Sequence, residues 1–514
     1  MTAESARDVV VAERPEPGEP RPYAFPSVAR SQLDNGLTIL VADLPGRPLV
    51  SATMIVPVGA ADEPASDGGA AVLAARALTE GTERYDAVGL TEAAERLGAS
   101  LHAEAGWDAT SVGVDVPSAR LAPALELLAD VLLRPTFPRS DVDRLRDERL
   151  NDLLQAQADP RRRADETFIG TIYAAASPYH RPAAGTRETV EGLDDTVARR
   201  AYERILDPAR ATLVVGGDLG GQDVVEIARS LFGGWARHEG AVGPSQILDQ
   251  GAGTGRLVRV VHRPGSVQTE IRVGHPGLPR RVPDYHAVTV MGAILGGLFN
   301  SRLNMQLREA KGYTYGAGAG FEMRRGAGPF TARAAVNTEV TVPAIVDMLA
   351  ELERMRDTRV TDAELASARD FLVGVFPLRF ETPGAVVGAL SGLAVHGLPL
   401  DELTDYRSRV EAVDIDAVAA AARAHLQVDR AAIVLVGDVD AFGADLEAAG
   451  LGRLIIDRDE PAGGQMAPEG EAAAVGPTDE GEEAGPTAGA EDPSMPGTDD
   501  PGAADTKPED DPAA

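Results

Sequence analysis

Apolar and polar positions along the chain form two kinds of segment. Short β-branched runs, such as residues 211–217 (ATLVVGG) and 432–437 (AIVLVG), close on a glycine and are typical of buried strands. Other segments carry helical patterns of apolar residues. Helices are expected over residues 69–79, 120–133, 140–157 and 285 to about 310.

The same order of segments occurs twice, at an offset of about 220 residues. Residues 190–194 (VEGLD) match residues 410–414 (VEAVD), and each leads into an alanine- and arginine-rich helical pattern. Residues 211–218 (ATLVVGGD) match residues 432–438 (AIVLVGD). A repeat of this length indicates two copies of one domain. We therefore predict an α+β fold of two homologous domains, each a mostly antiparallel sheet with helices packed on one face.

The boundaries of these domains follow from changes in composition. A glycine-rich stretch with a Pro-Ser turn signal separates the two copies, and the last residues are rich in Gly, Pro, Ala and acids. We predict a flexible N-terminal arm (1–25), a first domain (26–238), a linker (239–255), a second domain (256–456) and an acidic disordered tail (457–514).

Composition narrows the classes of function. The chain has 514 residues, a formal net charge of −31 and no cysteine, so disulfides and thiolate metal ligands are excluded. From Asp459 to Ala514, sixteen Asp and Glu stand against one Lys, so the tail carries about −15. The remaining charge of about −16 and the lack of clustered cations argue against nucleic acid and membrane partners. Because no signal peptide or bilayer-spanning run is found, we expect a cytoplasmic protein.

Several motifs carry a resemblance to a known family. Residues 33–38 (LDNGLT), 295–303 (LGGLFNSRL) and 307–315 (LREAKGYTY) resemble the insulinase and mitochondrial processing peptidase family. The resemblance extends over nearly the whole of both predicted domains and is strongest in the second. It implies the fold of zinc peptidases that are built from repeated α+β domains.

Catalytic members of that family carry H-x-x-E-H on the first long helix, where two histidines bind zinc and the glutamate polarises the attacking water. Alignment on Gly69 places Val72, Ala75 and Arg76 at the His, Glu and His positions. Valine and alanine have no donor atoms, and a protonated guanidinium does not bind a cation. The family's third ligand, an acid, would fall around Asp152. We therefore expect a degenerate zinc site at this helix.

A displaced histidine site is not expected either, because no two of the eight histidines are three or four residues apart. We predict that this chain binds no metal of its own. The histidines are His102, His180, His238, His262, His275, His286, His396 and His425.

The second predicted domain keeps a different part of the family's machinery. Catalytic members use an arginine and a tyrosine, seven residues apart, to hold the substrate backbone and stabilise the oxyanion, and Arg308 and Tyr315 have this spacing. An ordinary structural role, with Arg308 paired to Glu309 and Tyr315 as a strand aromatic, remains an alternative.

Two-domain members of the family often pair as homologous subunits, of which one supplies the zinc helix and the other the arginine and tyrosine. The resemblance thus implies a non-catalytic, substrate-contacting subunit of a heterodimeric zinc endopeptidase. Its partners would be a homologous subunit that carries H-x-x-E-H and zinc, and a peptide substrate. A catalytically inactive structural protein of the same fold, like the core subunits of respiratory complexes, is the alternative. An independent metallopeptidase is a third possibility, and it predicts bound zinc in the purified chain.

Overall fold

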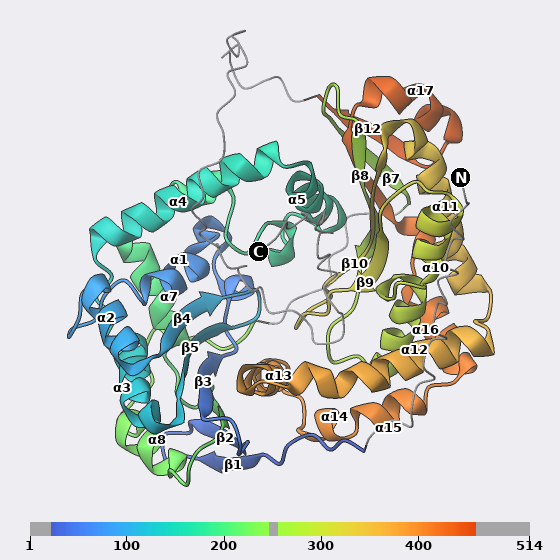
Figure 1. Cartoon of the computed structure of the whole chain (residues 1–514). Helices are drawn as coiled ribbons and strands as arrows, with labels where there is room; N and C mark the ends of the chain where they lie inside the picture. Colours follow the sequence, from blue (N-terminus) through green and yellow to red (C-terminus); the bar gives the residue numbers. More distant parts are fainter. Residues whose placement is uncertain (1–21, 246–254, 459–514) are drawn as a thin grey trace, which may run out of the picture.

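Two six-stranded mixed sheets form the framework of the protein in its computed structural model, which describes residues 22–245 and 255–458 (Figure 1). Most of the predicted N-terminal arm (1–21), the middle of the predicted linker (246–254) and the acidic tail from residue 459 lie outside the described residues. No helix in the described ranges has both the length and the apolar character that a membrane span requires.

The first sheet has the order β1-β2-β6-β3-β5-β4. Four of its five neighbouring pairs are antiparallel, and β2 with β6 is the parallel one. Its strands are β1 (Ala29–Gln32), β2 (Thr38–Asp43), β3 (Leu49–Val56), β4 (Ser100–Ala105), β5 (Thr110–Pro117) and β6 (Thr212–Gly217).

The second sheet repeats this arrangement with the order β12-β7-β11-β8-β10-β9. Its last five positions correspond one by one to those of the first sheet. At the first position β12 runs parallel to its neighbour, whereas β1 runs antiparallel. The predicted repeat and the mostly antiparallel sheets are thus confirmed. The strands are β7 (Leu257–His262), β8 (Gln268–Pro276), β9 (Ala317–Phe321), β10 (Pro329–Asn337), β11 (Ala432–Gly437) and β12 (Arg453–Asp457).

Helices of each half cover one face of that half's own sheet, as Figure 1 shows. In the first half these are chiefly α1 (Ala70–Ala77), α2 (Ala87–Leu97), α3 (Leu121–Leu133), α7 (Asp195–Ile205) and α8 (Val224–Phe232), with α4 (Arg139–Ala158) packed on α1. In the second half they are chiefly α9 (Tyr285–Gly292), α11 (Thr341–Asp357), α12 (Asp362–Val375), α16 (Ile415–His425) and α17 (Val439–Ala449).

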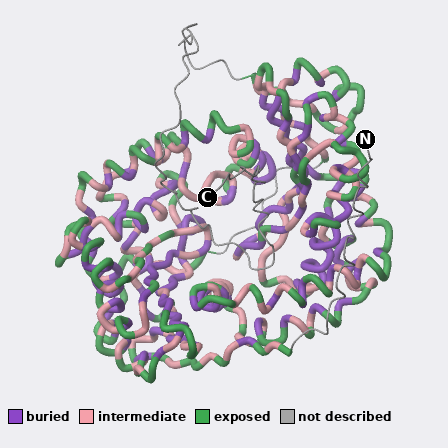
Figure 2. Tube along the Cα trace, viewed as in Figure 1, coloured by how far each residue is buried: buried purple, intermediate pink, exposed green. Residues whose placement is uncertain are grey.

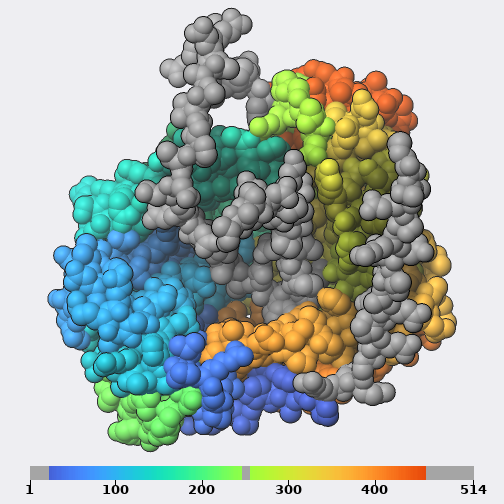
Figure 3. Space-filling model, in the orientation of Figure 1, coloured from blue at the N-terminus to red at the C-terminus, as the bar shows by residue number. Residues whose placement is uncertain are grey.

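The other face of each sheet is covered by a helix from the opposite half. α13 (Pro383–His396) packs on β3 and β6 of the first sheet, and α5 (Pro160–Ile172) packs on β8 and β11 of the second. This exchange explains why the central strand β11 is buried at every position. A strand that is covered on both faces has a continuous apolar sequence instead of an alternating one. Figure 3 shows the orange surface around α13 directly against the blue surface of the first strands.

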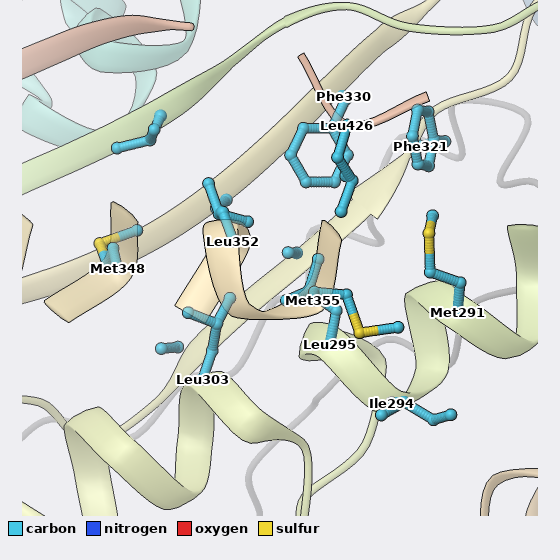
Figure 4. Packing of buried hydrophobic residues seen from close by; sticks show 14 of the residues in the cluster. Met291, Ile294, Leu295, Leu303, Phe321, Phe330, Met348, Leu352, Met355 and Leu426 are labelled. Atoms are coloured by element: carbon cyan, nitrogen blue, oxygen red, sulfur yellow. The ribbon is translucent and has the colours of Figure 1, made fainter. Parts of the chain in front are cut away.

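The largest hydrophobic core lies between the second sheet and its own helices (Figure 4). Leu295 and Leu303 from the helical segments meet Leu352 and Met355 of α11 and Phe330 of β10, all of them buried. Figure 2 shows this buried interior in purple, with exposed residues concentrated on the outer helices. The long apolar segments of the second half therefore serve packing rather than a ligand site.

The single helix predicted from Tyr285 to about Ala310 is wrong, because the chain breaks into two helical segments. After α9 and a π-helical turn (Ala293–Gly297), Leu298 is extended, and helix resumes at Arg302–Asn304 (α10). Gly296 lies against the backbone of Ala319, where any Cβ would approach the Ala319 nitrogen to 2.1 Å. This close approach places the break at the two glycines, which are weak helix formers.

Candidate functional site

Helix α1 carries Val72, Ala75 and Arg76, the residues that the sequence motif aligns with the family's His, Glu and His. Val72 is half-buried, Ala75 is buried with 1% of its surface exposed, and Arg76 is exposed. The helix packs on α4, α7 and β4, so its place in the fold is intact although its side chains lack metal-binding atoms.

A carboxylate does face α1, but it is Glu148 rather than Asp152. Arg76 donates to Glu148 at 2.9 Å, and the other oxygen of Glu148 accepts from Arg144 at 2.6 Å. Arg144 also reaches Glu80, just beyond the end of α1, at 2.6 Å. The chain of ion pairs thus connects α1 to α4, where a shared metal would connect them in a catalytic member. The side chains of Arg76, Arg144 and Glu148 are nearly half exposed, so the pairs that Glu148 makes contribute little to stability. The Glu80 side chain is 17% exposed.

Asp152, the acid predicted from the sequence, points to a different set of partners. It accepts from Arg162 at 2.8 and 3.0 Å and also pairs with Arg149. The hydrogen bond from Arg162 lowers the pKa of the Asp152 carboxyl below its usual range. Asp152 and Glu148 are one turn apart on α4, and Glu148 is the one that pairs with Arg76 of α1.

A small pocket beside α1 has the wrong charge for a metal ion. It is lined by Val72 and by three arginines, Arg76, Arg146 and Arg149. Guanidinium groups remain protonated and have no acceptor atom for a cation. The residues present here therefore do not fit zinc.

Glu63 anchors the start of α1. Its carboxylate accepts from the backbone nitrogens of Gly69 at 2.8 Å and Ala71 at 2.9 Å, and it pairs with Arg181 at 2.9 Å. These bonds satisfy donors that are otherwise unpaired at a helix N-terminus. The side chain is 3% exposed, and burial raises the pKa of Glu63 from its usual value near 4.5 to about 7.

This raised pKa predicts a pH dependence of stability. Because the folded state binds the Glu63 proton more tightly than the unfolded state does, the contribution of Glu63 is greatest below pH 4.5 and is lost as the pH rises to about 7. Urea unfolding of the wild type and Glu63→Gln between pH 4.5 and 8 should show the wild type losing stability relative to the variant across this window. A difference that does not change with pH would contradict the assignment.

A cluster in the second half has the composition of a metal site but not its electrostatics. His262 lies 3.8 Å from Asp438 and 3.6 Å from Asp440, with the three groups close enough to share an ion. However, Asp438 already accepts from the Gly265 nitrogen at 2.8 Å and caps α17. Arg458 donates to Asp440 at 2.6 Å and supplies the positive charge there. The carboxylates are therefore occupied by protein donors.

Two histidines of the second half, buried His275 and half-buried His286, have structural roles. His275 contacts the carbonyl oxygen of Pro276 at 2.8 Å and the backbone nitrogen of Gln427 at 3.0 Å. Burial lowers the pKa of His275, and likewise that of His286, to about 4. Both rings are therefore neutral near pH 7 and are packed in the core of the second half.

Arg308 and Tyr315 lie on the surface of the second half. Arg308 is in a π-helical segment (Met305–Ala310), 3.4 Å from Glu309, with its guanidinium 4.6 Å from the centre of the Phe299 ring. Tyr315 lies two residues before β9 rather than on a strand, and it is 91% exposed. Tyr315 makes no hydrogen bond with another residue in the described ranges. Part of the ordinary role for Arg308, its pairing with Glu309, is thus present, whereas Tyr315 is not an ordinary strand aromatic.

The structure does not bring this pair to α1 within one chain, because the two features lie in different halves (Figure 1). It does bring other exposed apolar side chains to the segment of Arg308. Phe299 is 64% exposed and Met305 is 47% exposed. The sequence motif indicated Arg308 and Tyr315 but not Phe299 and Met305. Phe299 nevertheless lies within residues 295–303, which carry part of the family resemblance.

Comparison with known protein families matches both halves of the chain. Residues 38–186 match the model described as insulinase (peptidase family M16). Residues 194–372 match the model described as the peptidase M16 inactive domain. Together the two models span both sides of the predicted linker.

Individual relatives cover most of the chain. An uncharacterised zinc protease of Streptomyces coelicolor is 26% identical over 429 residues, which are 82% of this chain and 92% of the relative. An uncharacterised zinc protease of Mycobacterium tuberculosis strain H37Rv is 25% identical over 417 residues, 81% of this chain and 94% of the relative. The non-peptidase homologue YmxG of Helicobacter pylori is 22% identical over 377 residues, 72% of this chain and 84% of the relative.

Solved structures show the same fold. A peptidase M16 inactive domain from Pseudomonas fluorescens superposes with a TM-score of 0.74 at 24% identity, over 80% of this chain and 98% of that one. A protease from Helicobacter pylori gives a TM-score of 0.75 at 19% identity, over 81% of this chain and its whole length. With two models of one family on residues 38–186 and 194–372 and relatives along most of its length, the chain belongs to the insulinase family of peptidases, peptidase family M16.

Proposed function

We propose that this chain is the non-catalytic, substrate-contacting subunit of a heterodimeric zinc endopeptidase. Its partner would be a homologous subunit that carries H-x-x-E-H and binds zinc, and its own contribution would be Arg308 and Tyr315. The observation that carries the proposal is a contrast between the halves. Helix α1 has Val72, Ala75 and Arg76 in place of ligands, whereas Tyr315 is 91% exposed with its phenol directed to no described residue.

The chemistry of the two side chains suits a peptide held at a neighbouring metal. The guanidinium of Arg308 offers several fixed donors to peptide carbonyl oxygens. The phenol of Tyr315 donates to an oxygen that gains negative charge during attack on the peptide bond. The guanidinium of Arg308 lies over the exposed ring of Phe299, and this cation–π contact helps to hold its position. Single π-helical turns are frequent at functional sites, which agrees with the position of Arg308.

The experiment is reconstitution with a homologue that bears H-x-x-E-H, followed by a peptide cleavage assay. Arg308→Ala combined with Tyr315→Phe should lower kcat/KM by about 10²-fold, because it removes donors that act on the developing charge. Arg423→Ala combined with Tyr313→Phe is the matched control. It removes a guanidinium from an exposed residue of α16 and a phenol hydroxyl from the half-buried tyrosine two residues before Tyr315. Undiminished cleavage by the Arg308 and Tyr315 variant would show that these residues have no such role.

A structural or assembly protein of the same fold is the second candidate. It is favoured by the ion pairs that join α1 to α4 without a metal, and by the relative that is named a non-peptidase homologue. Affinity purification separates the two functions, because a stable assembly that lacks any H-x-x-E-H subunit supports the structural role. An independent metallopeptidase requires zinc in the purified chain, and elemental analysis near zero would remove it.

A further inference from the structure

A group of arginines lies on the face of the second sheet that α5 covers. Arg272 of β8 and Arg333 of β10 are direct cross-strand partners, so their side chains emerge on the same face. Arg272 pairs with Asp165 of α5 at 2.5 Å, which identifies this face as the one under α5. Arg161, in the first turn of α5, accepts from Arg272 through its backbone carbonyl at 3.4 Å.

The two nearest carboxylates form ion pairs with Arg272, the buried arginine of this group. Arg272, which is 1% exposed, pairs with both Asp165 and Glu270, the latter at 2.8 Å. The side chains of Arg161 and Arg333 are exposed and form no hydrogen bond or ion pair with another residue in the part of the chain that is described. Burial, and then the charges of Arg161 and Arg272, lower the pKa of Arg333. Among the described residues, neither guanidinium group has an ion pair of its own, although Asp165 and Glu270 lie near enough to Arg333 to raise its pKa in part.

The surface around Arg333 is open. The neighbouring strand β9 is the last strand of the sheet, and its residues on this face are Gly318 and Gly320. The Nε atom of Arg333 lies 3.9 Å from the position that a Cβ of Gly318 would take. Gly318 and Gly320 have no side chains, so they add no bulk to this face of the sheet. An extended polypeptide therefore has room to lie along these strands.

We propose that the acidic segment of this chain itself, residues 459–514, binds this face of the second sheet through Arg161 and Arg333. The charges are complementary, because the segment has sixteen Asp and Glu against one Lys. It contains no Phe, Tyr, Trp, Ile or Leu, so ionic contacts rather than apolar burial carry the interaction. This inference is independent of the proposed proteolytic role.

The connection of the chain permits this contact. The described residues end just after β12, which lies at the opposite edge of the same sheet from β9. Five strand spacings of about 4.8 Å correspond to about 24 Å across the sheet. A segment of 56 residues spans much more than that at about 3.4 Å per extended residue. An intramolecular ligand also has a high effective concentration, which strengthens ionic contacts that are weak singly.

Because the chain has no cysteine, paired labels test the contact directly in the full-length protein. The substitutions Glu339→Cys, beside the end of β10, and Ser494→Cys, in the acidic segment, would provide the sites for a donor and an acceptor dye. Energy transfer should be high at about 0.02 M salt and fall at least twofold at about 1 M salt, where the Debye length is near 3 Å. Arg161→Gln combined with Arg333→Gln should cause a similar loss at low salt.

The matched control is Arg120→Gln combined with Arg423→Gln, which removes two exposed positive charges elsewhere on the surface. This control should keep the transfer of the wild type. Excess poly-glutamate should also displace the segment and lower the transfer. Equal transfer in the two arginine variants, or binding of poly-glutamate without any change in transfer, would overturn the proposal.

Discussion

The Arg325→Ala variant should have a free energy of unfolding lower by about 3–5 kcal/mol than the wild type, because it removes the cation that balances the buried carboxylate of Asp62. The backbone nitrogens of Gly59 and Ser245 that also donate to Asp62 carry no full charge. Arg325 lies in the loop between β9 and β10 and enters the first half of the chain. Its guanidinium donates to Asp62 at 2.8 Å, and the Asp62 side chain has no exposed surface. The same guanidinium donates to the carbonyl oxygen of Pro57 at 3.1 Å.

The rest of the loop is held equally closely to the first half. The Arg325 backbone nitrogen donates to Asp108 at 2.5 Å, and Tyr173 donates to the Ala327 carbonyl at 2.8 Å. The guanidinium of Arg324 lies 4.7 Å from the centre of the Trp107 ring. These contacts make the loop a fixed bridge between the halves rather than a surface turn.

Urea unfolding followed by tryptophan fluorescence measures this prediction, since Trp107 lies at the bridge. Arg359→Ala is the control. The side chains of Arg359 and Asp416 are 66% and 70% exposed, so their ion pair should stabilise the fold by less than about 1 kcal/mol. Adding Asp62→Asn to Arg325→Ala should recover part of the loss, because the uncompensated charge is then removed. A loss as small as that of the control would show that Asp62 does not depend on Arg325.

The second large effect concerns the halves when they are separated. A chain of residues 22–245 alone should fail to form a stable, cooperatively unfolding monomer, because its sheet loses the helix that covers one face. In the whole protein Val387 and Leu390 of α13 pack against Leu40, Ile55 and Val214 of the first sheet, all buried. Exposure of such a continuous apolar face favours aggregation.

Expression of residues 22–245 together with residues 255–458 as two separate chains provides the test. Because α13 and α5 are exchanged between the halves, the two fragments should copurify and together give the circular dichroism spectrum of the intact protein. The isolated first fragment should bind hydrophobic dyes and sediment as aggregates. Cooperative thermal unfolding of that fragment alone, near the Tm of the intact chain, would contradict this expectation.

Much of the local structure was accessible from the sequence. The expected helix over residues 69–79 is α1 (Ala70–Ala77), and the expected helix over 140–157 is α4 (Arg139–Ala158). The buried strands β6 and β11 coincide with the two β-branched runs. These elements are set by local periodicity and by turn residues, which act over a few positions and are visible in one segment.

The candidate site was predicted in part. The prediction of a degenerate zinc helix depends only on Val72, Ala75 and Arg76, whose side chains are not zinc ligands wherever the helix lies. The family's third ligand was expected around Asp152, and the structure adds that Arg76 contacts Glu148, one turn earlier on α4. Spacing along a helix locates an acid to within about a turn, and only the packing of α4 on α1 decides which turn faces inward.

The sequence alone therefore determined the duplicated fold, the lack of zinc-binding side chains at Val72, Ala75 and Arg76, and the seven-residue spacing of Arg308 and Tyr315. Only the tertiary structure decided the exchange of α5 and α13, the insertion of Arg325 beside Asp62, and the open face with Arg161 and Arg333. The reason is physical. Each of these features joins residues more than a hundred positions apart, and such contacts are set by how whole faces are buried rather than by any local pattern.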